Sequence, residues 1–308
     1  MLDEKDCFDR ECLVLIDCSY LIYYSLHGAY NEWFKTSENK ILISENYKDI
    51  PYDDLPDLTT CDDYTRIYAE YLLKRIDSIN WILKNKIFNQ FDTIRTTTFL
   101  CQDSPLKTNW RMQYYQEYKA HRKLVKHKFK VKNAFNYAQD VLFPKLNLEE
   151  YFKIHTLRVA DAEGDDVIAS MCKNSKIKNK IIIASDQDFL QLRDDYNARM
   201  FNLEGVEVLP EEYKKNPVSA KQYLFAKILM GDDSDNINQV FPRCGYQTAM
   251  KYVLDTESLK ARLNADAAAK KQFVINNKII NFDNIPTDLQ QLVITESEKL
   301  LKEEEMPF

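Results

Sequence analysis

Glycine and histidine are both scarce in this chain of 308 residues, which contains five glycines and four histidines. The sequence has no GxGxxG turn, no GxxxxGKS/T loop and no GxSxG elbow, which argues against a dinucleotide site, a Walker-type phosphate loop and a hydrolase nucleophile turn. No two histidines have HExxH spacing, so a zinc protease is not expected. Any chemistry in this chain is therefore expected to depend on carboxylates.

The seven cysteines form no CxxC pair, and their odd number favours a reducing compartment. No segment approaches the roughly 18 apolar residues of a membrane span. The polar, acidic residues 1–10 do not resemble a secretory signal. We therefore expect a cytoplasmic protein without a membrane partner, built as one large domain or two modest ones.

The net charge is −6, from 42 basic and 48 acidic residues, whereas nucleic-acid-binding proteins are often basic overall. The basic residues are nevertheless concentrated in one place, because residues 119–132 (KAHRKLVKHKFKVK) contain seven Lys or Arg and no acid. Taken alone, this run slightly favours a solvated helix face. Its separation from the acidic groups also fits a surface for a polyanion beside a metal site.

Short apolar runs alternate with helix-like patterns along the first two thirds of the chain, which predicts a mostly parallel α/β sheet flanked by helices. We expect residues 29–60 to be a loop or insertion. The expected strands are 13–16, 94–100, 152–155, 180–184 and 198–202. The expected helices are 20–26, 68–87, 108–122, 135–142, 162–172, 223–230 and 245–253, with shorter helices to residue 302. The predicted organisation is a tail (1–12), an α/β core (13–215) with a basic arch at about 108–145, and a helical duplex-binding region (216–308).

Carboxylates follow the predicted strands in a regular order. A lone Asp after a strand usually caps a turn, and acids at a helix start are favoured by the helix dipole. The ordered combination is more specific, because the carboxyl ends of parallel strands meet at one edge of a sheet. The candidate metal ligands are Asp17, Asp103, Glu163, Asp165, Asp166, Asp186, Asp188, Asp232 and Asp235.

Such a cluster of carboxylates requires cations, because like charges a few ångströms apart repel and raise each other's pKa. Oxygen-rich sites suit Mg²⁺, with Mn²⁺ as a substitute. Two such ions form the arrangement used for phosphodiester hydrolysis. The sequence therefore predicts a site for two Mg²⁺ ions.

Several short motifs stand out along the chain: LID at 15–17, YKAHR at 118–122, EGDD at 163–166, SDQDF at 185–189, GDDSDN at 231–236 and NFDNIP at 281–286. Together they resemble the flap-endonuclease-type 5′-nuclease family, and most of all its ribonuclease H branch in T-even phages. The resemblance covers about residues 10–300. The chain departs from the family at Gly164, where Ala is usual, at Gln247, where Lys is usual, and at the insertion 29–60, which has no assigned counterpart.

The resemblance implies roles for these residues. Lys119 and Arg122 would act on the scissile phosphate from one helix face, and Tyr118 would stack on a base. One metal ion would be held by Asp17, Asp103, Glu163, Asp165 and Asp186, and the other by Asp188, Asp232 and Asp235. Single-stranded and duplex DNA would contact Lys123, Lys126, Lys128, Lys130, Lys132, Gly245, Gln247 and Thr248.

We therefore expect a metal-dependent 5′-to-3′ nuclease with ribonuclease H activity, acting as a monomer at 5′ ends, flaps and RNA primers during phage or viral DNA replication. In that case it would be located in the host cytoplasm. Apolar side chains within the acidic residues 1–10 suggest a docking peptide for a sliding clamp or single-strand-binding protein, although a disordered terminus is the simpler interpretation. The alternatives are a catalytically inactive nucleic-acid-binding relative and an RNA-specific nuclease of the PIN type.

Overall fold

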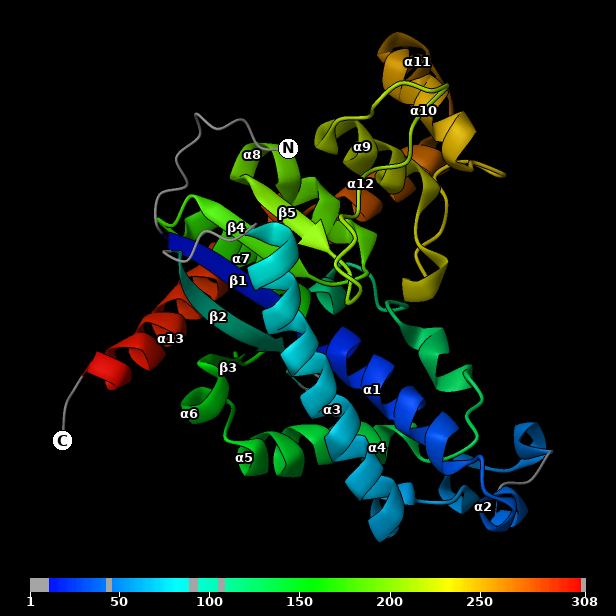
Figure 1. Cartoon of the computed structure of the whole chain (residues 1–308). Helices are drawn as coiled ribbons and strands as arrows, with labels where there is room; N and C mark the ends of the chain where they lie inside the picture. The colour runs from blue at the N-terminus through cyan, green and yellow to red at the C-terminus, as the bar shows by residue number, and fades with distance from the viewer. Residues whose placement is uncertain (1–10, 43–45, 89–93, 105–108, 306–308) are drawn as a thin grey trace.

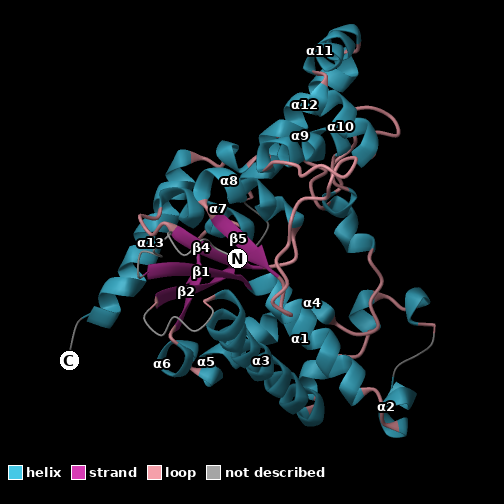
Figure 2. Cartoon of the chain, turned by 45° about the horizontal axis from the view of Figure 1, so that its top comes forward, coloured by secondary structure: helices cyan, strands magenta, loops and turns pink. Residues whose placement is uncertain are grey.

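A five-stranded parallel sheet forms the centre of the molecule in this computed structural model, which describes residues 11–42, 46–88, 94–104 and 109–305 (Figure 2). The strand order is β3-β2-β1-β4-β5. The central strand, β1, is parallel to β2 on one side and to β4 on the other, so all five strands end at the same edge. The strands are β1 (Glu11–Asp17), β2 (Arg95–Gln102), β3 (Ile154–Arg158), β4 (Asn179–Ile183) and β5 (Ala198–Phe201).

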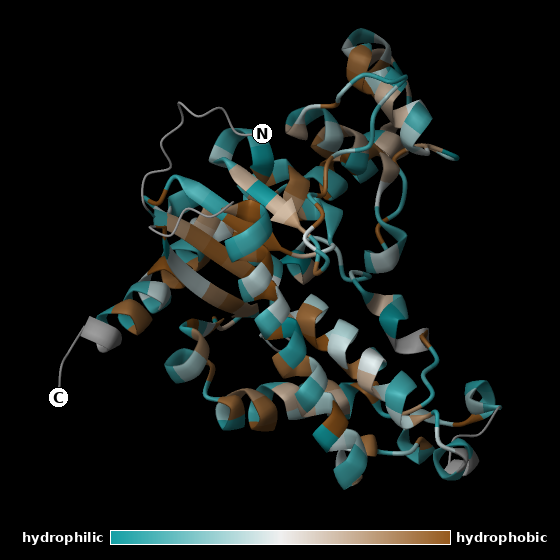
Figure 3. Cartoon of the chain, viewed as in Figure 1, coloured by the Kyte–Doolittle hydropathy of each residue, from teal (hydrophilic) through white to brown (hydrophobic). Residues whose placement is uncertain are grey.

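Helices cover both faces of the sheet, so its central strand β1 is buried on both sides and almost continuously apolar, and this strand is brown in Figure 3. Alternate residues of β1 enter different cores. Val14 and Ile16 pack with α1 (Cys18–Trp33), α3 (Asp62–Ile82), α4 (Val131–Tyr137) and α5 (Phe143–Leu146). Leu13 and Leu15 pack on the other face with α7 (Gly164–Asn174) and α13 (Thr287–Glu305).

A helical region follows the sheet and projects to one side of it, at the upper right of Figure 1. It contains α9 (Ala220–Met230), α10 (Tyr246–Leu254), α11 (Thr256–Ala265) and α12 (Ala267–Ile280), and α9 packs on both α10 and α12. The short helices are α2 (Ser37–Leu42), α6 (Leu148–Phe152) and α8 (Arg193–Tyr196). None of the described helices is long and apolar enough to cross a membrane.

The predicted parallel α/β architecture and the helical C-terminal region are confirmed. Two local predictions are wrong. Within residues 29–60, α1 continues to Trp33 and α2 follows, because a buried stripe that includes Ala29 and Tyr30 packs on the core. The segment 108–122 forms no α-helix in its described part; it contains two 3₁₀ turns at Trp110–Gln113 and Ala120–Leu124. The proposed docking peptide lies outside the described residues.

Candidate metal centre and nucleic-acid surface

Two aspartates lie side by side where β1 and β2 end. Asp17 is the last residue of β1 and caps α1, since its Oδ1 accepts a hydrogen bond from Tyr20 N at 3.2 Å. Asp103 follows β2, and its two oxygens accept hydrogen bonds of 2.6 Å from Ser19 Oγ and from Gly164 N. The start of α7 is therefore held directly against the end of β2.

Gly164 permits this close approach. A Cβ at this position would lie 3.1 Å from the Cys101 carbonyl oxygen and 3.3 Å from Asp103 Oδ1, which is tighter than most side chains tolerate. The departure from the family's Ala thus has a local structural reason. The shorter side chain lets α7 come within hydrogen-bonding distance of a candidate metal ligand.

Three candidate ligands have raised pKa values in this arrangement. Burial and the charges of Asp103 and Asp186 raise the pKa of Asp17 to about 7. Burial, Asp186 and Asp17 raise the pKa of Asp165 well above its usual value. Burial and Asp186 also raise the pKa of Asp188 to about 7, although Lys227 opposes the change. These carboxylates therefore form one electrostatically coupled group that carries more negative charge than its surroundings compensate.

Glu163 belongs to the same rim but is already neutralised. Its Oε2 accepts hydrogen bonds from Arg111 Nη1 at 3.0 Å and from Tyr118 Oη at 2.9 Å, and its Oε1 pairs with Lys119. Burial alone would raise the pKa of Glu163, but Lys119 and Arg111 outweigh burial and lower that pKa to about 2. Glu163 therefore stays ionised without a metal.

Asp166 does not face the rim, so its assignment as a metal ligand is corrected. The side chain is fully buried and forms an ion pair of 2.8 Å with Arg111, while its Oδ2 accepts hydrogen bonds from Trp110 Nε1 and Glu163 N. The sequence pattern did not single out Arg111, which also donates to the Ile279 carbonyl of α12 at 2.9 Å. Arg111 thus links the start of α7 to the helical region.

A second lysine, Lys227 of α9, joins two of the predicted ligands. Its Nζ lies 2.7 Å from Asp188 Oδ1 and 2.8 Å from Asp232 Oδ2. Burial alone would raise the pKa of Asp232, but Lys227 lowers it below the usual value. No motif included Lys227, although its position as the one basic side chain within the apolar stretch YLFAKILM could have indicated it.

Asp235 meets the basic motif at 118–122. Its Oδ1 lies 2.6 Å from Arg122 Nη2, its Oδ2 lies 3.8 Å from Lys119 Nζ, and Tyr118 Oη donates to it at 3.1 Å. Lys119 has a left-handed backbone (φ 57°) and its N–H donates to the Asp235 carbonyl at 2.9 Å. Lys119 and Arg122 therefore converge through a turn and not through the predicted helix face.

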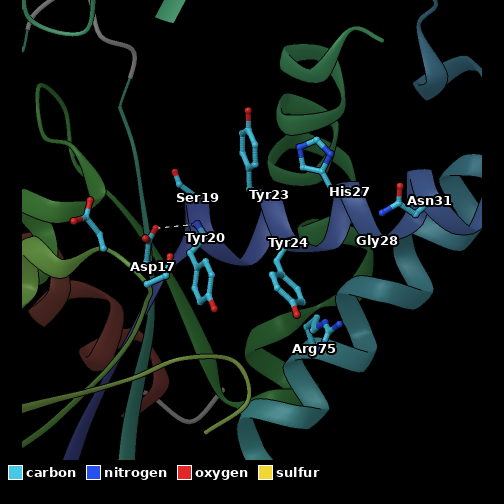
Figure 4. A pocket seen from close by; sticks show the side chains of 11 residues that line it. Asp17, Ser19, Tyr20, Tyr23, Tyr24, His27, Gly28, Asn31 and Arg75 are labelled. Carbon is cyan, nitrogen blue, oxygen red and sulfur yellow. Dashed lines mark hydrogen bonds between the residues drawn. The ribbon is translucent and has the colours of Figure 1, made fainter. Parts of the chain in front are cut away.

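Tyr118 is buried, with 6% of its surface exposed, and its hydroxyl is bonded to two carboxylates, so the predicted stacking role is wrong. A different tyrosine is available. Tyr23 of α1 is 43% exposed and its ring lies 5.0 Å from that of His27. Both line a cavity of about 650 Å³ that runs from Asp17 along α1 (Figure 4).

The basic run follows the surface of α1 and then enters α4. Phe129 anchors it, because its ring is 2% exposed and stacks on Tyr30 at 5.1 Å. Lys128 Nζ lies 5.8 Å from the Tyr30 ring centre, and the Lys130 N–H donates to the Pro56 carbonyl. Of the predicted contacts, Lys126, Lys128 and Lys132 are exposed and Lys130 is half-buried, while Lys123 lies in the 3₁₀ turn at 120–124.

The predicted duplex contacts lie at the start of α10. Gly245 is exposed and caps this helix with extended backbone, and a Cβ there would meet no atom within 4 Å. Gln247 is exposed and Thr248 is half-buried. The role of these three residues in binding DNA stays a prediction.

The candidate ligands are not arranged around a single metal position. Among residues 11–42, 46–88, 94–104 and 109–305, no three His, Cys, Asp or Glu side chains form a ready-made metal-binding group. The predicted second ligand set is divided, because Lys227 holds Asp188 and Asp232 whereas Arg122 holds Asp235. The first set of acids has hard oxygen donors and uncompensated charge, which fits a divalent cation.

Comparison with known proteins finds similarity in part of the sequence and in the fold. Residues 78–223 match the N-terminal resolvase-like domain of 5′-3′ exonucleases. The structure resembles the 5′-exonuclease of bacteriophage T5 with bound zinc, at a TM-score of 0.61 and 15% identity, covering 94% of this chain and 98% of that one. It also resembles the bacteriophage T5 D15 flap endonuclease in a complex with DNA and metal ions, at 0.59 and 16%, covering 96% and 100%. No curated protein sequence matches the chain.

Proposed function

We propose that this chain is a member of the flap-endonuclease-type 5′-nuclease family, as the similarity of residues 78–223 and of the fold supports, and that it is a metal-dependent 5′-to-3′ nuclease acting at 5′ ends, flaps and RNA primers on DNA duplexes. One observation carries the proposal. The charge of Asp186 acts on both Asp17 and Asp165 at the carboxyl edge of the sheet, and Lys119 and Arg122 reach the same rim. Acids and bases in this arrangement suit the cleavage of a phosphodiester.

The carboxylates are proposed to hold two Mg²⁺ ions, with Mn²⁺ as a substitute. Asp17, Asp103, Asp165 and Asp186 would hold the first ion, and Asp188, Asp232 and Asp235 the second. When bound, the ions would polarise the phosphodiester and activate water. Glu163 is saturated by Lys119, Arg111 and Tyr118, so we assign it to positioning these groups.

The basic motif supplies the second part of the chemistry. Arg122 has half of its side chain exposed, so its guanidinium can donate to a phosphate while it stays near Asp235. Lys119 is only 9% exposed and lies deeper, where it stabilises negative charge on Glu163 and on the reacting phosphate. Tyr23 replaces Tyr118 as the residue that stacks on a base at the mouth of the site.

The nucleic acid is proposed to follow one surface. The cavity beside α1 begins at Asp17 and Asp186 and continues past Tyr23 and His27, and Figure 4 shows these two rings on the same side of α1. The run at 119–132 lies beside this surface, since the pKa of His27 is lowered mainly by burial but also by the charge of His127 in that run. A single-stranded 5′ end can lie there with phosphates on lysines and bases on aromatic rings.

The biological setting is a finer part of the proposal. The similarity to phage ribonucleases H supports removal of RNA primers during phage or viral replication in the host cytoplasm. The chain would act as a monomer, with a clamp or single-strand-binding protein as the partner of residues 1–10. Deletion of residues 1–9 should reduce cleavage only when such a partner is present, and an unchanged stimulated rate would exclude the docking role.

A single assay tests the enzymatic proposal. A 5′-flap duplex, an RNA primer on a nicked duplex and free RNA are incubated with the full chain, with and without Mg²⁺. We expect Mg²⁺-dependent cleavage of the first two substrates. Cleavage of free RNA alone would support an RNA-specific nuclease, and binding without cleavage of any substrate would support an inactive relative.

A further inference from the structure

Lys227 lies between two carboxylates that are assigned to a metal, yet no motif includes it. Its ammonium is within hydrogen-bonding distance of Asp188 and of Asp232, at 2.7 and 2.8 Å. The three side chains are each 15–17% exposed, so solvent screens the interaction only weakly. The ammonium therefore occupies oxygens that a cation would otherwise use.

The position of Lys227 is fixed by its surroundings. Its neighbours Ala226 and Leu229 are fully buried in the core, so this turn of α9 cannot move away from the sheet. Gly231 ends the helix with φ 68°, and a Cβ there would lie 2.4 Å from the Ile237 carbonyl oxygen. The helix and the loop that carries Asp232 are thus locked together at a distance that the lysine side chain spans.

We propose that Lys227 is a built-in counter-ion that competes with a divalent cation for Asp188 and Asp232. This inference rests on the proposed function, which assigns both aspartates to a second metal ion. An ammonium and a divalent cation repel each other and cannot bind the same two oxygens. An incoming ion must therefore displace Lys227.

The two metal positions are consequently unequal. In the described part of the chain, no ion pair joins a basic side chain to Asp17, Asp103, Asp165 or Asp186. A first metal ion that binds these aspartates therefore has no paired ammonium group to displace. A second ion binds weakly until a phosphate of the nucleic acid offers Lys227 another anionic partner. Substrate would thereby complete the metal centre.

Calorimetric titration of the full chain with Mg²⁺, without nucleic acid, tests the inference. Lys227→Met should tighten the weaker binding event by about tenfold or more, since it removes one positive charge from the site. Lys227→Arg keeps the charge and should bind Mg²⁺ as the wild type does. Lys221→Met is the matched control, because Lys221 lies on the same helix and pairs with the exposed Asp195 at 3.2 Å.

Thermal unfolding provides a second readout. Without metal, Lys227→Met should melt below the wild type, because two aspartates lose their partner, and Mg²⁺ should raise its melting temperature by more than that of the wild type. If Lys227→Met does not fold without metal, Lys227→Gln carries the same comparison. Unchanged or weaker Mg²⁺ binding by the neutral variant would overturn the inference and leave the proposed function intact. A wild type that binds no divalent ion would overturn the proposed function itself.

Discussion

Glu163 and Asp165, at the start of α7, are two residues apart in the sequence, yet their pKa values are shifted in opposite directions. The pKa of Glu163 is lowered to about 2, whereas burial, Asp186 and Asp17 raise the pKa of Asp165. The difference does not come from burial, because both groups lie deep in the rim. It comes from their neighbours: Glu163 faces Lys119 and Arg111, and Asp165 faces other acids.

The same division continues across the rim. Asp17 shares the raised pKa of Asp165, and Asp232 shares the lowered pKa of Glu163, whereas Asp188 keeps a raised pKa although it pairs with Lys227. Carboxylates that the chain neutralises itself serve to hold basic side chains in place. A divalent cation binds most favourably to the carboxylates whose charge the chain leaves uncompensated.

The largest effect is expected when an uncompensated acid is removed. Asp165→Asn should reduce single-turnover cleavage of a 5′-flap substrate by about 10³-fold or more. It should also raise the metal-free stability by about 1–2 kcal/mol, since a repulsive charge disappears. Asp233→Asn is the control, because Asp233 is exposed in the GDDSDN loop, and it should change neither quantity. A metal-free stability below that of the wild type would contradict the division between the two kinds of carboxylate.

The next effect concerns the basic residues that neutralise the other acids. Lys119→Met should lower the single-turnover rate by about 10²–10³-fold with a smaller change in affinity, as is typical for loss of one donor to developing charge. Joint replacement of Lys126, Lys128 and Lys132 should instead weaken binding and flatten its salt dependence by about 0.7 per phosphate contact. A salt series for each variant measures both quantities. The assignment of Lys119 to the chemical step fails if both variants lose affinity alone.

The pH dependence of the metal-free protein should follow from the raised pKa values. Asp17 and Asp188 bind protons more tightly in the folded chain than in the unfolded chain between about pH 4 and 7, so the free energy of unfolding should fall as pH rises through this window. We expect a decrease on the order of 2–4 kcal/mol. Glu163 acts in the opposite sense, and its contribution is lost only as pH falls toward about 2. Denaturant unfolding at pH 5 and pH 7 measures the difference, which saturating Mg²⁺ should abolish.

The smallest effect concerns the contact between β2 and α7. Gly164→Ala should cost about 0.5–1 kcal/mol or less, because the Cys101 carbonyl and Asp103 must move by a few tenths of an ångström. Mg²⁺ affinity should fall by less than tenfold. Gly28→Ala is a poor control because its Cβ would collide with Tyr71, so Gly245→Ala, which meets nothing, is the suitable one. A loss of Mg²⁺ affinity larger than tenfold would show that Asp103 cannot shift to accommodate the added methyl group and still bind the ion.

The acids at the ends of the strands could be predicted, because the pattern that indicates them lies within a few consecutive residues. An apolar run followed by an acid predicts a buried strand and a carboxylate at one edge of the sheet, and Asp17, Asp103 and Asp186 lie there. The basic partners could not be found in this way. Arg111 reaches Glu163 and Asp166 across about 50 residues of chain, and no periodic pattern encodes such a contact.

The error at Tyr118 and Lys119 has a related cause. Spacing placed Lys119 and Arg122 on one helix face, but the left-handed backbone at Lys119 forms a turn that is bonded to the carbonyl of Asp235. This tertiary contact turns Tyr118 inward toward Glu163. The direction of the side chains in residues 118–122 is thus set by a loop more than 110 residues away. The periodicity of a single sequence carries no information about such a contact.

The contact between Arg111 and the Ile279 carbonyl also bears on how the protein is made. A nascent chain is synthesised from its N-terminus, and domains generally fold in that order. Here the strands and the acids that directly follow them leave the ribosome before Lys227, Asp232 and Asp235, and the acceptor for Arg111 comes later still. The proposed nuclease site is therefore incomplete until residue 279 has emerged, so a product terminated before that residue would be released without the completed site.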